Sequence, residues 1–272
     1  MADLSSHQSS TTTKLLLIGD SGAGKTGSLA SLADAGYNLR IIDLDNGLDA
    51  LRNLLSDPKS RYDKLAITRV KYKTITETSV NISTVPNSPR SATVWTRMVN
   101  SISHWKDGKE DLGPITSWTT EDVLVIDSLT LAGIAAMNFA AVGQTVRDNR
   151  NLYFGAQNLL ENLVQNLYSE AVKCNVIITS HISYIENEAQ IVRGYPTTIG
   201  RALSSKIGRY FNSVLLIKTE GKNRKIYTSP TSFVELKNAA PLRVKDTYEI
   251  HSGLADFFKD VRTPTPTLSV VA

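Results

Sequence analysis

Short apolar runs alternate with amphipathic stretches along most of this chain. The first half shows three strand-length runs separated by two helical stretches, in the order KLLLIG, TGSLASLADAG, LRIIDLD, GLDALRNLLS and KLAITRVKY. The strand-length runs are largely apolar, whereas the stretches between them repeat apolar residues at helical spacing. Strands joined through helices pair in parallel, because a crossover helix returns the chain to the same edge of the sheet. The pattern therefore predicts an α/β fold with a mostly parallel sheet flanked by helices.

The second half continues this alternation after a Thr-, Ser- and Asn-rich loop over residues 73–90. We expect helices over ATVWTRMVNSISHW, SLTLAGIAAMNFAA, FGAQNLLENLVQNLYSEAVK and RALSSKIGRYF, and strands over VLVID, NVIITSH and NSVLLIKTE. Residues 106–122 and the polar segment up to Ile199 are predicted to be connections. The turn EGKN joins the last of these strands to RKIYTSP as a β-hairpin, and GLADFFKDV closes the fold as a short helix.

These patterns divide the chain into four parts. We expect a disordered tail over residues 1–13, a core over residues 14–218, a β-hairpin and short helix that extend the core over residues 219–262, and a flexible tail over residues 263–272. The first tail is rich in Ser and Thr and lacks periodicity, and the last carries Pro264 and Pro266.

Composition and charge exclude several classes of protein. With 41% hydrophobic and 21% charged residues the chain is of ordinary globular composition, and its 30 Lys and Arg against 26 Asp and Glu give a mild net charge of +4. The single Cys174 leaves no internal disulfide and no zinc module to propose. The longest apolar runs are too short to cross a bilayer, and the polar start does not resemble a signal peptide. We therefore expect a soluble cytoplasmic protein without a membrane partner.

The segment GDSGAGKT carries the clearest chemistry. It matches G-x-x-x-x-G-K-[ST], follows an apolar strand and precedes a helix, which is the context of a phosphate-binding P-loop (Walker A motif). Lys25 would bring a cation to the β- and γ-phosphates, and the Thr26 hydroxyl would ligate Mg²⁺. The predicted nucleotide-binding residues are Gly19, Asp20, Ser21, Gly22, Ala23, Gly24, Lys25 and Thr26.

An acid at the end of a second buried strand complements this loop. VLVIDS places Asp127 at the carboxyl edge of its strand, where open α/β sheets bind ligands. We predict that Asp127 and Thr26 hold the Mg²⁺ of bound ATP.

The group that would activate water for hydrolysis is less clearly marked. Asp43 and Asp45 end the strand LRIIDLD, and we expect at most one of them to point at the nucleotide. Asp45 and Glu77 are candidate general bases. The alternative for each is an acid on the surface or at a helix cap, without a catalytic role. His181 ends the strand NVIITSH, where it would sense the γ-phosphate. The alternative is a histidine at a strand end whose hydrogen bonds are satisfied within the fold and that has no functional role.

Cations and aromatic residues lie together after the central helix. Arg147 and Arg150 precede Tyr153 and Phe154, a combination that suits a single-stranded nucleic-acid backbone and its bases. A solvated loop over packed aromatic residues is the alternative.

The order of these segments resembles one family, the core-only RecA-like P-loop ATPases encoded by bacteriophages. They are related to the RecA and UvsX recombinases and are described as single-strand annealing ATPases. The resemblance rests on GDSGAGKT, on IIDLDNG, on the stretch from Trp105 through Trp118 to VLVIDSLTLAGIAAMN, and on IITSHISY with YPTTIGRALSSKIGRYFNSVLLIK. It implies a RecA-like P-loop NTPase core with a C-terminal β-hairpin extension, in the cytoplasm of an infected bacterial host.

The resemblance also implies partners. Protomers would assemble head to tail into a ring or filament with ATP between them, and a phage single-strand binding protein is a further expected partner. Single-stranded DNA would contact residues 142–152 and residues 183–199, the second including Tyr184, Arg193 and Tyr195. Lys206 occupies the place of a cation that reaches the neighbour's γ-phosphate, and a helix-surface lysine is the alternative.

Two departures from the family pattern stand out. The resemblance implies a catalytic glutamate just before the helix that begins near Ala92, but the chain has Ser91, Ala92 and Thr93 there, with Glu77 well upstream. No polymerisation peptide is evident between Met1 and Lys14.

The leading hypothesis is a DNA-dependent ATPase that promotes annealing or strand exchange in phage recombination. The alternative is a nucleotide-gated binding module of a phage replication complex with little hydrolysis. A small-molecule kinase is disfavoured because the loop over residues 73–90 lacks an arginine-rich lid.

Overall fold

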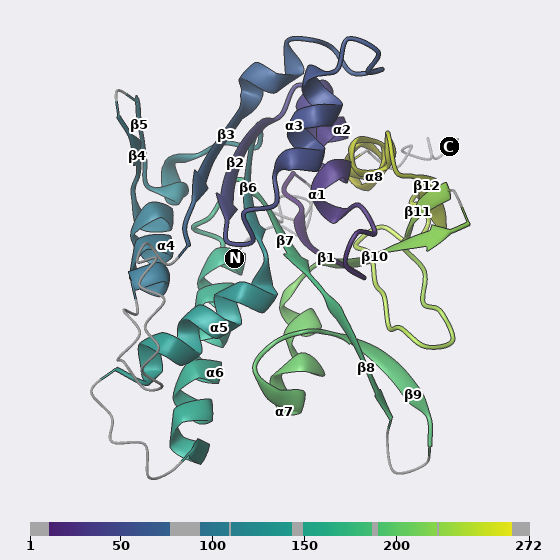
Figure 1. Ribbon diagram of the computed structural model, residues 1–272. Helices are drawn as coiled ribbons and strands as arrows, with labels where there is room; N and C mark the ends of the chain where they lie inside the picture. Colours follow the sequence, from purple (N-terminus) through teal and green to yellow (C-terminus); the bar gives the residue numbers. More distant parts are fainter. Residues whose placement is uncertain are drawn as a thin grey trace, which may run out of the picture.

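A mostly parallel sheet forms the centre of the molecule (Figure 1). The computed structural model describes residues 11–76, 93–108, 110–142, 149–186, 190–221 and 223–262. Within these residues the main sheet has eight strands in the order β12-β11-β10-β1-β7-β6-β2-β3. The six strands from β10 to β3 pair in parallel, and β10, β11 and β12 pair antiparallel. The prediction of an α/β fold with a mostly parallel sheet is confirmed.

The strands of this sheet have the following bounds: β1 Lys14–Gly19, β2 Asn38–Asp43, β3 Val70–Thr74, β6 Asp122–Asp127, β7 Asn175–Ser180, β10 Ser213–Glu220, β11 Asn223–Tyr227 and β12 Thr247–Glu249. The helices are α1 Lys25–Ser28, α2 Ala30–Asp34, α3 Asp49–Ser56, α4 Thr93–Ser103, α5 Leu129–Ala140, α6 Asn149–Tyr168, α7 Gly200–Ser204 and α8 Gly253–Arg262.

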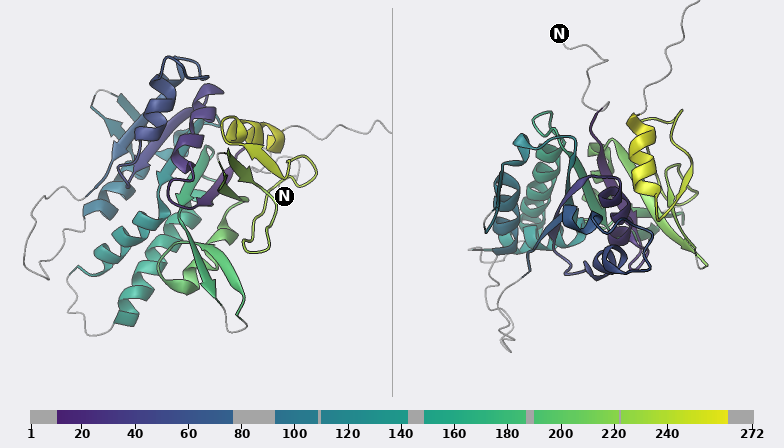
Figure 2. Two further views of the ribbon diagram at one scale, coloured as in Figure 1. Left: turned by 45° about the vertical axis from the view of Figure 1, so that its right-hand side comes forward. Right: turned by 90° about the horizontal axis from the view of Figure 1, so that it is seen from above.

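Helices cover both faces of the sheet, which explains why the central strands are apolar nearly throughout (Figure 2). In β1, Leu15 and Leu17 pack with the apolar residues of α2, α3 and α8, whereas Leu16 and Ile18 pack with those of α4, α5 and α6. Strands buried on both faces lose the alternation of polar and apolar residues. Among the described residues, no helix combines the length and the apolar character that a bilayer crossing needs.

One expected strand is shorter than predicted, and two segments expected to be connections contain strands. The strand expected over KLAITRVKY is confirmed only from Val70 onward, as the short edge strand β3, because Ala66–Arg69 before it form a 3-10 turn. Residues 106–122 contain most of the hairpin of β4 Trp105–Asp107 and β5 Glu110–Gly113, and the segment up to Ile199 contains the hairpin of β8 Ile182–Glu186 and β9 Val192–Pro196. Both hairpins are largely solvent-exposed, so their strands carry polar residues and resemble loops in sequence.

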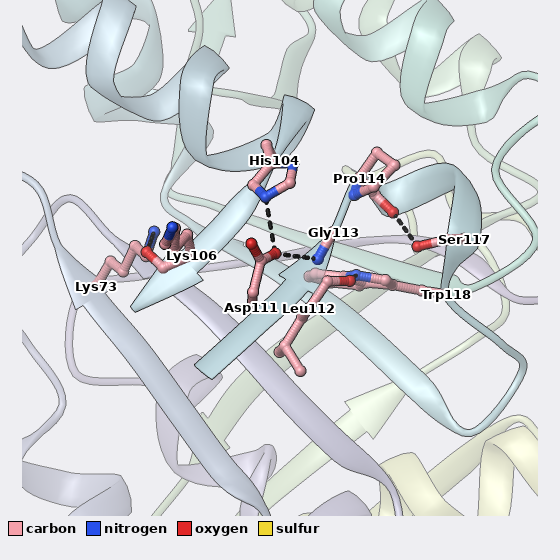
Figure 3. A network of polar contacts seen from close by, with 9 residues as sticks. All are labelled: Lys73, His104, Lys106, Asp111, Leu112, Gly113, Pro114, Ser117 and Trp118. Atoms are coloured by element: carbon pink, nitrogen blue, oxygen red, sulfur yellow. Dashed lines mark hydrogen bonds and ion pairs between the residues drawn. The ribbon is translucent and has the colours of Figure 1, made fainter. Parts of the chain in front are cut away.

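Polar contacts fix the β4–β5 hairpin at the edge of the sheet (Figure 3). Asp111 accepts hydrogen bonds from His104 Nε2 at 2.7 Å and from the Gly113 backbone N–H at 3.0 Å. The His104 imidazole holds the pKa of Asp111 below its usual range. The Trp118 indole donates to the Leu112 carbonyl at 3.0 Å, and Lys73 Nζ donates to the carbonyl of Lys106 at 2.8 Å. The hairpin is therefore anchored to β3.

The C-terminal strands and α8 pack against the helix that follows the P-loop. Phe257 and Phe258 are fully buried among residues of α2 and β1. At Gly253 an added Cβ would lie 2.8 Å from Ile226 Cδ1 and 2.9 Å from Tyr248 Cβ, so only glycine allows this approach of α8 to the sheet. The strand β12 carries only three residues and was missed by the sequence analysis.

Candidate nucleotide-binding site

The loop between β1 and α1 has the backbone that its glycines predict. Gly22 and Gly24 have φ values of 73° and 106°, a region that residues with a Cβ rarely adopt. An added Cβ at Gly19 would lie 2.5 Å from the carbonyl oxygen of Ile217 on the neighbouring strand β10. The three glycines therefore hold the loop close against the end of the sheet.

Lys25 is the buried cation of this loop. Its side chain is 7% exposed, and Nζ donates to the carbonyls of Gly19 and Asp20, both at 2.9 Å. Burial lowers the pKa of Lys25, and the carboxylates of Asp127, Asp45 and Asp20 oppose that shift. Two carbonyl dipoles solvate the ammonium only in part, so an anion at the loop would be bound strongly.

Asp127 and Thr26 lie in direct contact at the carboxyl edge of the sheet. The Thr26 hydroxyl donates to Asp127 Oδ2 at 2.6 Å, and the Thr179 hydroxyl donates to the other carboxylate oxygen, Oδ1. β7 lies between β1 and β6, and its register places Thr179 beside Asp127. The role of Thr179 was missed in the sequence, because it depends on which strand neighbours β6.

The two acids at the end of β2 have different surroundings. Asp43 is 1% exposed and accepts from the Thr74 hydroxyl at 3.1 Å and the Gly47 backbone at 3.2 Å, and its burial raises its pKa. Asp45 lies two residues beyond the end of β2 and lines the nucleotide cavity, where the Ser128 hydroxyl donates to its Oδ1 at 3.0 Å. Desolvation and the nearby Asp127 raise the pKa of Asp45. Asp45 is therefore the acid of this pair that faces the cavity.

His181 lines the same cavity from the end of β7. Its backbone N–H donates to the Thr130 hydroxyl at 3.2 Å, and its carbonyl accepts from the Thr197 backbone at 2.8 Å. These contacts fix the backbone of His181 between the core sheet and the β8–β9 hairpin.

The cavity has a volume of about 500 Å³, which is the size of a small-molecule site. Its lining combines the P-loop with acids from two strands and with residues from the C-terminal part of the chain: Ser21, Gly22, Gly24, Lys25, Thr26, Gly27, Asp45, Gly47, Ala50, Leu54, Tyr62, Asp127, His181, Arg224, Ile250 and His251.

The residues at the cavity floor fit Mg²⁺. A hydroxyl and a carboxylate oxygen converge there, and Mg²⁺ prefers oxygen ligands, taking one or two carboxylates together with water and substrate phosphates. Among the described residues there is no cluster of three or more His, Cys, Asp or Glu of the kind that binds a metal without substrate. Thr26 and Asp127 would hold the ion, which would neutralise phosphate charge.

We expect Asp127→Asn to uncouple nucleotide binding from Mg²⁺. The amide removes the anionic ligand, worth several kcal/mol in the transition state, so Mg²⁺-dependent turnover should fall about 100-fold or more while some nucleotide binding survives. The test is a titration with ATP in Mg²⁺ and in EDTA, with the exposed Asp107→Asn as control. If ATP binding and turnover by Asp127→Asn kept the Mg²⁺ dependence of the wild type, Asp127 would not be a ligand of the ion.

Among the residues predicted to contact DNA, those that the structure describes are not part of the cavity lining. The predicted DNA contact Arg147 and the candidate base Glu77 fall outside the described residues. Arg150 and Tyr153 lie near the start of α6, and Tyr153 is 47% exposed. Tyr184, Arg193 and Tyr195 lie on the β8–β9 hairpin, which projects from the same end of the molecule as the start of α6 (Figure 1).

The two faces of this hairpin differ. Tyr184 pairs with Gly194, whereas Arg193 and Tyr195 pair with Ile185 and Ser183 and point to the opposite face. Tyr184 is 53% exposed, and its pKa is raised by burial and by the charge of Asp20. Arg193 forms an ion pair with Glu235 at 2.6 Å.

Lys206 is exposed and lies apart from the P-loop cavity of its own chain. It lines a surface cavity of about 380 Å³ together with Tyr195, Arg209 and Lys237. A role for Lys206 at a phosphate would therefore require a neighbouring protomer.

Comparison with known proteins gives a family match and distant likenesses to many solved structures, of which two are described. A family model described as AAA domain matches residues 11–240. The RadB recombinase structure aligns with a TM-score of 0.48 and 13% identity over 89% of each chain. An ATPase from the type III secretion system of pathogenic bacteria aligns with a TM-score of 0.37 and 15% identity, over 76% of this chain and 51% of that one. Neither likeness bears on function. No curated protein matches.

Proposed function

Because this chain belongs to the AAA domain family, with the α/β core of a RecA-like P-loop NTPase, we propose that it hydrolyses ATP and couples hydrolysis to single-stranded DNA. The main support for ATP hydrolysis is that one cavity is lined by Lys25, Thr26, Asp127 and Asp45. They supply the cation, the metal ligands and the acid that phosphoryl transfer to water requires.

Each of these residues has a distinct task. Lys25 neutralises charge on the β- and γ-phosphates, and Mg²⁺ held by Thr26 and Asp127 supplies further charge neutralisation when bound. Asp45 orients a water molecule and removes its proton, and a raised pKa makes its carboxylate a better base at neutral pH. The Ser128 hydroxyl fixes the orientation of Asp45, because it holds one of the two carboxylate oxygens.

The DNA part of the proposal is supported by exposed aromatic residues at one end of the molecule. Tyr153 and Tyr184 are each about half exposed and can stack on bases, and Arg150 lies one turn before Tyr153 on α6. We further propose annealing or strand exchange in phage recombination, alongside a phage single-strand binding protein, in a ring or filament where Lys206 reaches the neighbour's nucleotide.

The discriminating experiment is the ATPase rate with and without single-stranded DNA. We expect stimulation in the wild type and weaker DNA binding in Tyr184→Ala, by about 5- to 100-fold, since a base–aromatic stack contributes about 1–3 kcal/mol. The matched control is Tyr72→Ala, a tyrosine that is 56% exposed on the edge strand β3.

Equal DNA affinity in Tyr184→Ala and wild type would exclude the hairpin as the contact. ATP and DNA binding without turnover would instead favour the nucleotide-gated binding module of a replication complex.

A further inference from the structure

The nucleotide cavity extends beyond the phosphate loop into a second, less polar half. This half is formed by Leu54 of α3, Tyr62 of the following loop, Arg224 of β11, and Ile250 with His251 directly after β12. Its residues carry no recognisable motif, and Ile250 and His251 lie beyond residues 11–240, where the family match ends.

Two glycines of the P-loop region bring this half against the phosphate site. An added Cβ at Gly24 would lie 2.7 Å from Ile250 Cδ1 and 3.3 Å from Arg224 Cδ, and one at Gly27 would lie 3.2 Å from Leu54 Cδ1. Leu54 therefore stands next to Gly27 on one side, and Ile250 with Arg224 stands next to Gly24 on the other. The space between them adjoins the first turn of α1, next to Lys25.

Backbone and side-chain contacts hold the two sides together. The Tyr62 hydroxyl donates to the carbonyl of His251 at 2.9 Å, and Tyr62 itself is only 9% exposed. The Ile250 backbone N–H donates to the Arg224 carbonyl at 3.3 Å, which links the two residues of that side. The close approach of Gly253 to Ile226 fixes the chain just after this segment. The second half of the cavity is thus built before any ligand arrives.

The chemistry of this half suits a flat heteroaromatic ring. Leu54, Ile250 and the ring of Tyr62 offer apolar surface, and the exposed guanidinium of Arg224 is planar and stacks well on aromatic faces. A ring bound here would lie in the same cavity as phosphates at Lys25.

We propose that Tyr62, Arg224, Ile250 and His251 form the base-binding subsite of the nucleotide and take a purine ring. The subsite rests on the proposed ATP-binding function, and it makes the C-terminal strands part of the nucleotide site.

The test compares ATP with inorganic tripolyphosphate, which carries the phosphates without a base. Dissociation constants for both ligands are measured in Mg²⁺ for wild type, Arg224→Ala and Ile250→Ala. We expect ATP affinity to fall about 10-fold in either variant, as apolar and stacking contacts are lost. Tripolyphosphate affinity should stay within about 2-fold, because the P-loop contacts are retained. Leu242→Ala is the matched control, since Leu242 is 99% exposed in the same part of the chain.

The outcomes separate the subsite from the proposed function. The subsite would be overturned if the variants lost affinity for ATP and tripolyphosphate alike, or if they lost no affinity for ATP. In either case, ATP binding by the wild type would still support the proposed function. A wild type that binds neither ligand would overturn ATP binding and the subsite together. Unchanged tripolyphosphate binding also shows that Ile250→Ala, whose side chain is partly buried, has kept its fold.

Discussion

Replacing Lys25 with alanine is expected to abolish ATP turnover and to weaken ATP binding by about 100-fold. Lys25 is the one cationic residue between Gly19 and Thr26, and a charge-assisted contact to phosphate in a partly dehydrated site would contribute several kcal/mol. Removing it leaves the Gly19 and Asp20 carbonyls facing the phosphates without a counter-charge.

Steady-state hydrolysis and equilibrium binding of ATP together test this prediction. Lys64→Ala is the control, because Lys64 is exposed and is not part of the cavity lining. If Lys25→Ala bound and hydrolysed ATP like the control, Lys25 would have no role at the phosphates.

Replacing Asp45 with asparagine should separate binding from hydrolysis. The amide keeps the size of the side chain and can keep the contact with Ser128, but it cannot take a proton from water. We expect turnover to fall about 100- to 10,000-fold with ATP affinity nearly unchanged, as is typical when a general base is removed. Asp49→Asn, at the start of α3, is the matched control on the same connection.

The pH dependence of the rate provides a second measurement on Asp45. Its pKa is raised above the ordinary value of 3.8, so it loses its charge at a higher pH than an ordinary aspartate does. As pH is lowered, the wild-type rate should therefore begin to fall above that value. This acid limb should be missing from the residual rate of Asp45→Asn. A limb that persists there would assign the titration to another group.

How far the sequence could predict this molecule depends on how local each feature is. The P-loop and the strand of Asp127 were predictable, because each combines an apolar run with residues adjacent to it in the chain. Asp45 was a candidate among several acids, and the structure shows that it, unlike Asp43, lines the cavity.

The features that the sequence analysis missed depend on contacts between distant segments. Thr179 reaches Asp127 only because β7 lies between β1 and β6. Tyr62 meets His251 across 189 positions of the chain, and neither residue carries a motif. The β8–β9 hairpin was predicted as a loop, because its strands ISYIE and VRGYP are mostly solvent-accessible and do not alternate clearly.

A single residue connects the β8–β9 hairpin to β7, a strand that ends at the nucleotide cavity. β7 ends at Ser180 and β8 begins at Ile182, so His181 alone connects the two strands. His181 also lines the nucleotide cavity. The hairpin is also held along β9, where the Gly194 backbone N–H donates to the Phe233 carbonyl at 2.7 Å and Arg193 forms its ion pair with Glu235. The position of Tyr184 is therefore set both from the nucleotide cavity and from the segment that follows β11.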